Sequence, residues 1–177
     1  SVRMLSGSCP PSWPPVSYRA LQYSAVYPAV LTIHSWLRWV ALLLGAAATL
    51  NAYRHRTDTS ERPRGRWWDT FFMLALDLQV LFGLLLYLGL SPFSREVWSN
   101  VGVAVHDPAL RFWGVEHAVM MFGAAAAVRV GRVYAMGVKT TAMRRHGRCI
   151  WFAVAVLAML AGIPWPGLAG GRPLFRF

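Results

Sequence analysis

Four long apolar runs dominate this sequence of 177 residues and constrain its fold more than any other feature. They cover residues 27–50, 68–90, 109–130 and 149–168. Each run is close to the ~20 residues that an α-helix needs to cross a hydrocarbon core about 30 Å thick. Inside lipid the backbone must satisfy its own hydrogen bonds, and barrel strands would instead alternate over segments of about ten residues. The runs therefore predict an all-α integral membrane four-helix bundle.

The basic residues gather in the two connections that follow the first and the third run. The connection 51–67 holds five arginines against one Asp and one Glu, and residues 129–148 hold six Lys or Arg and no acid. Positive connections stay on the cytoplasmic side of a membrane. The pattern therefore predicts a multi-pass protein of the bacterial inner membrane, with both termini on the outer, periplasmic side.

The net charge of +11 raises the question of a nucleic-acid partner. The chain is 56% hydrophobic and only 14% charged, whereas soluble domains carry about 25% charged residues. Its positive residues are confined to short connections between apolar runs, which is a membrane-topology pattern. We therefore expect the lipid bilayer, and no nucleic acid, as a partner.

Two segments outside the runs complete the predicted organisation. Residues 1–26 are rich in Pro, Ser and aromatic residues, and their prolines exclude a regular helix. This N-terminal segment is either a floppy tail or an extended strap lying on a partner, since aromatic residues favour interfaces. Residues 27–168 form the transmembrane domain, and residues 169–177 are predicted to be a C-terminal interfacial tail.

Several polar side chains fall at membrane depth, where their cost makes them candidates for function. A rise of ~1.5 Å per residue places His34 and His117 at one level, about 10–12 Å below the outer surface. Glu116 lies beside His117, and Arg38 and Asp77 share a deeper level near 16 Å. Because a buried charge needs a partner, Arg38 is expected to face Asp77 or Glu116.

Gln79 is a further polar residue of the second run. It lies about 200° around the helix from Asp77, so these two side chains cannot both point into the same centre. Gln79 is therefore expected to bond to another helix or to another subunit.

His34 and His117 admit two interpretations. As ligands on separate helices at one level, they suit the two axial positions of haem b, with Arg38 near a propionate. They equally suit the magnesium of a (bacterio)chlorophyll or a hydrogen bond to a quinone. As structural residues, they are interhelical hydrogen-bonding groups, which a single histidine pair in four helices favours.

Small residues cluster toward the inner ends of the first and the third run. Gly45 with Thr49, and Gly123 with Ala127, stand four residues apart and so share a helix face. Such pairs predict close approach of two helix backbones. The alternative is space cleared for a flat cofactor or a lipid tail.

Six short motifs stand along residues 28–177. They are HSWLRW at 34–39, DLQVLFGLLLY at 77–87, RFWGVEHAVMM at 111–121, GR at 131–132, IPWP at 163–166 and RPLFR at 172–176. Together they resemble small four-helix membrane proteins of Bacteroidetes- and Gemmatimonadetes-type bacteria, often labelled only as hypothetical or cytochrome b-like. The cytochrome label implies haem at His34 and His117. The family pattern often has a further His two residues before GR, where this chain has Arg129, which weakens the case for a second haem.

The expected function is that of a non-catalytic accessory subunit of a bacterial energy-transducing membrane complex, respiratory or photosynthetic. Its partners would be the other membrane-protein subunits of that complex. The sequence has no nucleotide-binding loop and no nucleophile–base motif, so no catalytic residue is expected. The alternative is a b-type cytochrome-like electron carrier with one haem in the outer half of the bundle, and His34 and His117 as its metal ligands.

Overall fold

The part of the chain that the structure describes is mainly helical. The computed structural model describes residues 26–57, 66–137 and 139–175, and no strand occurs in these ranges. The long helices are α2 (Val26–Arg54), α3 (Arg66–Leu85), α7 (His117–Gly137) and α8 (Thr141–Ala161). The predicted all-α class is therefore confirmed. The predicted N-terminal strap lies outside the described residues, apart from Val26 at the start of α2.

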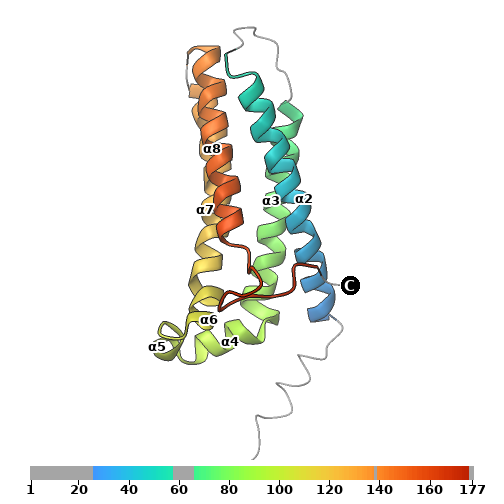
Figure 1. The fold of residues 1–177 in the computed structure, drawn as a ribbon, viewed down its shortest axis with the longest axis vertical. Helices are drawn as coiled ribbons and strands as arrows, with labels where there is room; N and C mark the ends of the chain where they lie inside the picture. Colours follow the sequence, from blue (N-terminus) through green and yellow to red (C-terminus); the bar gives the residue numbers. More distant parts are fainter. Residues whose placement is uncertain (1–25, 58–65, 138, 176–177) are drawn as a thin grey trace, which may run out of the picture.

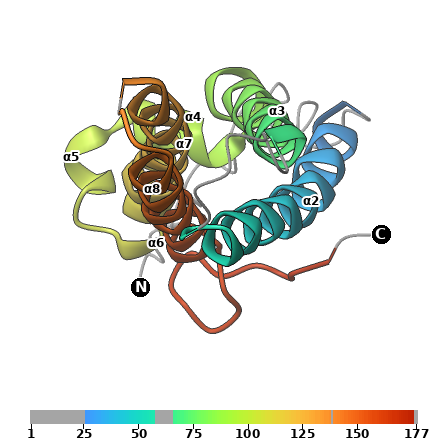
Figure 2. The same ribbon diagram turned by 90° about the horizontal axis from the view of Figure 1, so that it is seen from above.

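The long helices run alongside one another as two pairs, α2 with α3 and α7 with α8 (Figure 1). Seen along their length, α8 also packs against α2 and so joins the pairs on one side (Figure 2). The contact between α3 and α7 on the other side is much smaller. This asymmetry leaves room between α3 and α7, which the site described below uses.

The core consists mainly of small residues and a few rings. Ala41, Ala48 and Ala124 are fully buried, and the rings of Phe72 and Phe152 meet edge to face with centroids 5.8 Å apart. Small residues let helix backbones approach closely, which is how helices associate in lipid. The structure thus packs by close backbone approach around a few rings.

The two predicted small-residue pairs differ in their surroundings. A Cβ on Gly45 would lie 2.7 Å from the ring of Phe72 and 2.9 Å from Val156, so Gly45 is needed for α2 to approach α3 and α8. A Cβ on Gly123 would meet nothing within 4 Å. The prediction of close packing is therefore confirmed at Gly45. At Gly123 it is wrong for the described chain, because that position faces outward.

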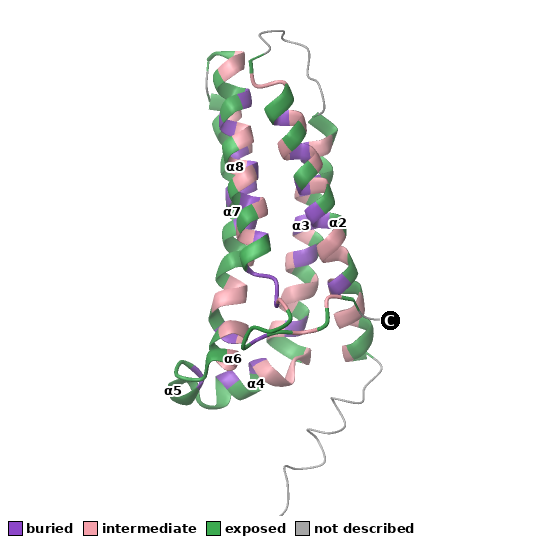
Figure 3. Cartoon of the chain, in the orientation of Figure 1, coloured by how far each residue is buried: buried purple, intermediate pink, exposed green. Residues whose placement is uncertain are grey.

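The outward surfaces of the long helices are apolar. Large side chains such as Leu43, Leu88 and Met136 are more than 70% exposed, while buried positions lie on the inner sides (Figure 3). Three helical stretches, Val26–Arg54, Arg66–Leu90 and Pro108–Gly137, are long and apolar enough to cross a membrane. Exposed bulky residues around a small-residue core suit a lipid environment.

The fourth predicted run, 149–168, differs most from the helix observed. Helix α8 begins eight residues earlier, at Thr141, where the Thr140 hydroxyl caps the backbone N–H of Met143. It ends at Ala161, because the prolines that follow cannot continue a helix. The helix is 21 residues long, but its first half carries Arg144, Arg145 and Arg148, which lowers its apolar character.

Short helices close one end of the molecule. Helix α3 continues into the π-helical segment η1 (Leu86–Leu90), and α4 (Pro92–Ser99) and α5 (Val101–Ala104) follow. Helix α6 (Pro108–Arg111) and the π-helical segment η2 (Phe112–Glu116) lead into α7. The side chains of Asn100 and Asp107 cap α5 and α6, accepting backbone hydrogen bonds of 3.1 and 2.8 Å. Such caps satisfy helix ends that have no intrahelical partner.

The segment after α8 crosses this same end of the bundle and reaches α2 (Figure 1). The carbonyl of Leu174 accepts hydrogen bonds from Arg38, at 2.7 Å, and from the indole of Trp39, at 3.3 Å. The ring of Phe175 stacks on Trp39 with centroids 5.3 Å apart. The described part of the predicted C-terminal tail is therefore folded back onto the first long helix.

Candidate functional site

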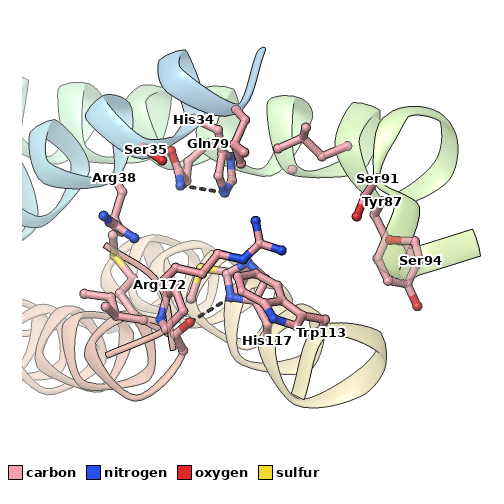
Figure 4. A pocket seen from close by; sticks show the side chains of 18 of the residues that line it. His34, Ser35, Arg38, Gln79, Tyr87, Ser91, Ser94, Trp113, His117 and Arg172 are labelled. Carbon is pink, nitrogen blue, oxygen red and sulfur yellow. Dashed lines mark hydrogen bonds between the residues drawn. The ribbon is translucent and has the colours of Figure 1, made fainter. Parts of the chain in front are cut away.

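A cavity of about 90 Å³ opens between the two helix pairs, near the end closed by the short helices (Figure 4). Long helices, η1, η2 and the segment after α8 all contribute to its wall. The polar side chains that line it are those of Tyr27, His34, Ser35, Arg38, Gln79, Tyr87, Ser91, Ser94, Trp113, His117 and Arg172. Three of the predicted site residues of the sequence, His34, Arg38 and His117, therefore meet in one cavity with Gln79.

His34 and Gln79 join α2 to α3 on the wall of this cavity. The side-chain amide nitrogen of Gln79 lies 3.2 Å from Nε2 of His34. Gln79 is only 2% exposed, and its amide oxygen and Nδ1 of His34 are buried without a hydrogen-bond partner. Gln79 thus bonds to another helix of the same chain, one of the two expected arrangements. A buried polar atom left without a partner is uncommon in native structures and calls for an explanation, such as a bound water or ion.

His117 faces His34 from α7. Its Nδ1 lies 2.7 Å from the carbonyl oxygen of Gly162, which can only accept a hydrogen bond. The proton therefore sits on Nδ1, and Nε2 carries a lone pair. The two imidazole rings have centroids 6.3 Å apart at an interplanar angle of 69°. Sequence depth alone placed these histidines at one level, and the structure brings them together.

Two guanidinium groups add positive charge to the cavity. Arg38 reaches the carbonyl of Leu174, while Arg172 lies over the rings of Phe93 and Trp113, at 4.5 and 4.6 Å from their centroids. The described residues that line the cavity include no carboxylate. The site therefore favours electronegative ligand atoms over cations.

The expected pairing of Arg38 with Asp77 or Glu116 is wrong. Asp77 forms an ion pair of 2.5 Å with Arg129, and Glu116 forms one of 2.7 Å with Arg111. The reason is the direction of each side chain. Asp77 points away from Gln79, as their angular separation requires, and so lies on the outer side of α3 next to α7. An equal depth in the membrane was therefore not sufficient to predict which charged side chains form an ion pair.

Several cavity residues were not found from the sequence. The hydroxyl of Tyr87 donates to the carbonyl of Gly114 at 2.7 Å, tying η1 to η2. Gly83 follows Gln79 by one helical turn, and a Cβ there would lie 3.2 Å from the His34 ring. The spacing of one helical turn from Gln79 could have identified Gly83 as a cavity residue from the sequence. No local pattern predicts Arg172, because it reaches the cavity only through the fold of the segment after α8.

The chemistry of the two histidines suits a haem iron, but their arrangement does not. A ligating histidine commonly donates its other ring N–H to a carbonyl, as His117 does to Gly162. Nε2 of His34, however, already bonds to Gln79. A cavity of about 90 Å³ is also smaller than the 150 Å³ that holds one benzene, and a haem is a four-ring macrocycle. The residues as arranged therefore do not fit a haem.

The arrangement is suited to hydrogen bonding rather than to bond cleavage. It offers a lone pair on His117 and one further donor and acceptor on the His34–Gln79 pair. In the described ranges no group of three or more His, Cys, Asp or Glu side chains is placed to hold a metal ion. Comparisons of the chain with protein families, with curated proteins and with solved structures find no match.

Proposed function

We propose that this chain is a four-helix transmembrane protein of the bacterial inner membrane, with both termini on the outer side. In this proposal it serves as a non-catalytic accessory subunit of an energy-transducing complex, respiratory or photosynthetic. The orientation follows from the arginines that flank the connections α2–α3 and α7–α8. In this orientation the cavity lies in the outer half of the bundle.

The ion pair between Asp77 and Arg129 carries the proposal of a partner subunit. Asp77 stands near the middle of the apolar stretch Arg66–Leu90. Its side chain is 38% exposed and that of Arg129 is 50% exposed, so the pair lies on the outer surface of the bundle. A charged side chain at the centre of a lipid bilayer costs at least about 2.5 kcal/mol. A neighbouring protein that covers the pair would remove this cost.

The surroundings of the pair support the same proposal. Phe122 and Val133 lie on the same face of α7 as Arg129 and are 50% and 62% exposed. Polar groups flanked by bulky apolar side chains are typical of surfaces where membrane proteins meet, because polar residues contribute interhelical bonds and apolar ones contribute packing. The surface of α3 and α7 around Asp77, Arg129 and Val133 is therefore the proposed contact surface.

Native gel electrophoresis of the tagged chain, extracted from its own membrane in mild detergent, tests this function. The chain should migrate within a larger assembly. A double variant, Asp77→Asn with Arg129→Gln, keeps hydrogen bonding but removes both charges, and it should release the chain from that assembly. The matched control, Glu116→Gln with Arg111→Gln, neutralises an exposed pair at the end of the bundle and should leave the assembly intact. Migration of the unaltered chain alone would contradict the proposal.

The alternative function is a b-type cytochrome-like electron carrier. One observation favours it, the approach of the His34 and His117 rings to 6.3 Å. The bond between His34 and Gln79 and the small cavity count against it. A reduced-minus-oxidised absorption spectrum of the purified chain separates the two functions. Haem bands that vanish in His34→Ala and His117→Ala would establish the cytochrome and displace the accessory role.

A further inference from the structure

A second cavity adjoins the first and leads sideways out of the bundle. It measures about 50 Å³ and lies between α3 and α7, where these helices make little contact. It shares His34, Gln79, Gly83, Tyr87, His117 and Met121 with the first cavity. Its remaining wall is apolar and consists of Val80, Leu84, Ala118 and Phe122. We call this opening the α3–α7 window.

The two cavities together have a polar end and an apolar end. The polar end holds the histidines, Gln79, the serines and Arg172. The α3–α7 window ends at Leu84 and Phe122, of which Phe122 is half exposed on the outer surface. A molecule that fills both must therefore have a compact polar head and an apolar chain.

The hydrogen-bonding capacity of the His34–Gln79 pair is only half used. If the amide donates to Nε2 of His34, then Nδ1–H of His34 and the amide oxygen remain unbonded. If the amide is turned over, Nε2–H donates to its oxygen, and the amide N–H and Nδ1 remain instead. Either way one donor and one acceptor have no hydrogen-bond partner; both atoms are buried in the cavity wall, so neighbouring side chains must shift before a ligand can bond to them.

His117 determines which hydrogen-bonding group a ligand must present on the side opposite His34. Its Nε2 has a lone pair, because Nδ1 donates to Gly162. A single oxygen atom at about 2.7–3.0 Å from each imidazole fits between rings whose centroids are 6.3 Å apart. Such an oxygen must give a hydrogen to His117 and can take one from His34 or Gln79. A hydroxyl group does both, whereas a carbonyl oxygen or an ether oxygen can only accept.

We propose that these cavities bind a lipid-soluble hydroquinone. One hydroxyl is held between His117 and His34, and the ring lies against Tyr87 and Trp113. The apolar chain leaves through the α3–α7 window. The two cavities adjoin, and their volumes of about 90 and 50 Å³ together approach the 150 Å³ that holds benzene, so the ring would occupy both cavities and the chain would begin beyond Leu84 and Phe122.

The remaining polar side chains of the cavity suit the second hydroxyl of a hydroquinone. Ser91, Ser94 and Arg172 also line the cavity, and Arg172 supplies positive charge for an oxygen atom. A lipid with one hydroxyl group would leave these groups unused. The proposal rests on the chain lying in a membrane but not on its membership of a complex, so the two can fail separately.

The reduced form should bind more tightly than the oxidised form. A quinone has two carbonyl oxygens and no hydrogen to donate, so it leaves the lone pair of His117 buried without a partner. The loss of one buried hydrogen bond reduces affinity by about tenfold or more. The site would therefore act as a store or a relay point that selects the quinol.

The experiment uses the isolated full chain in lipid nanodiscs, with decylubiquinol and decylubiquinone as probes and titration calorimetry as the measurement. Decylubiquinol should bind at least about tenfold more tightly than decylubiquinone. Absence of binding by either probe, as expected if the cavities hold only water, would overturn the proposal. Equal binding of the two probes would also overturn it.

Two variants locate the binding in these cavities. His117→Phe keeps a ring but removes the acceptor, so the ratio of quinol to quinone affinity should fall to about one. Gly83→Leu places a side chain against His34, at the junction of the cavities, and should abolish binding of both probes. The matched control Gly123→Leu, where a Cβ meets nothing within 4 Å, should bind like the unaltered chain. Circular dichroism checks that each variant remains helical. If a variant misfolds, the comparison of decylubiquinol with decylubiquinone on the unaltered chain still decides the proposal.

Discussion

Arg148 of α8 forms an ion pair with Asp69 of α3, and both side chains are largely withdrawn from the surface. Their exposed fractions are 15% and 8%. The sequence predicted the bounds of α8 only approximately. The ion pair joins α8 to α3 at the end of the bundle remote from the cavity. The two helices are not consecutive in the sequence, since α4 to α7 lie between them, so the pair is a long-range contact of the folded bundle.

Removal of one partner of this buried pair should be costly. Asp69→Ala leaves the Arg148 charge buried without compensation, and we expect a loss of about 3–5 kcal/mol in the free energy of unfolding. Glu116→Ala removes a partner from the Arg111 pair, which is exposed, and should cost about 1 kcal/mol or less. Reversible unfolding in mixed detergent micelles measures both. Equal losses for the two variants would mean that burial does not govern these pairs.

Gly45 should tolerate no larger side chain. A Cβ at this position already approaches the Phe72 ring to 2.7 Å, so Gly45→Leu must push α2 away from α3 and α8. Overpacking of this kind costs about 1–3 kcal/mol. Gly123→Leu adds the same atoms on an open face and serves as the control. The same micelle unfolding assay should show a clear loss for the first variant only.

The bond from Arg38 to Leu174 should keep the segment after α8 in place. Arg38→Ala removes a charged donor from the Leu174 carbonyl, a hydrogen bond worth about 1.5–3 kcal/mol. Amide hydrogen exchange of Leu168, Gly171 and Arg172 should then accelerate by about tenfold or more. Arg95→Ala removes a comparable but exposed bond to Gly89 and should leave these amides unchanged. Unaltered exchange in Arg38→Ala would contradict this prediction and show that the contacts of Trp39 and Phe175 are enough to hold the segment after α8 in place.

The proposed orientation can be tested by labelling with a membrane-impermeant thiol reagent. In a background with Cys9→Ser and Cys149→Ser, Gly102→Cys lies in the short helices and should react in intact cells. Lys139→Cys lies in the connection between α7 and α8 and should react only after the membrane is opened. The opposite result would place the arginine-rich connections outside and contradict the orientation.

The sequence predicted the long helices because hydrocarbon requires each to be apolar over about twenty residues. Their ends were less well defined. Helix α2 continues to Arg54 and α8 starts at Thr141, since basic residues at the water-facing end of a helix disrupt neither its hydrogen bonds nor its solvation. The π-helical segments η1 and η2 were not predicted, because a π-helical turn has no simple signature in residue type.

Part of the candidate site was also within reach of the sequence. Helical rise alone put His34 and His117 at one level, and helical rotation separated Gln79 from Asp77. The direction of each helix face was not determined, and so Arg38 was assigned the wrong partner. Its actual partner, the Leu174 carbonyl, belongs to the segment after α8, and a backbone carbonyl leaves no trace in a sequence.

That segment supplies two of the carbonyl groups on which the cavity depends, Gly162 for His117 and Leu174 for Arg38. It follows α8 in the sequence, so during synthesis it emerges after the four long helices of the described chain. Until it docks, the imidazole of His117 lacks the carbonyl that fixes its tautomer. A guest too wide for the side opening would have to enter before this segment docks.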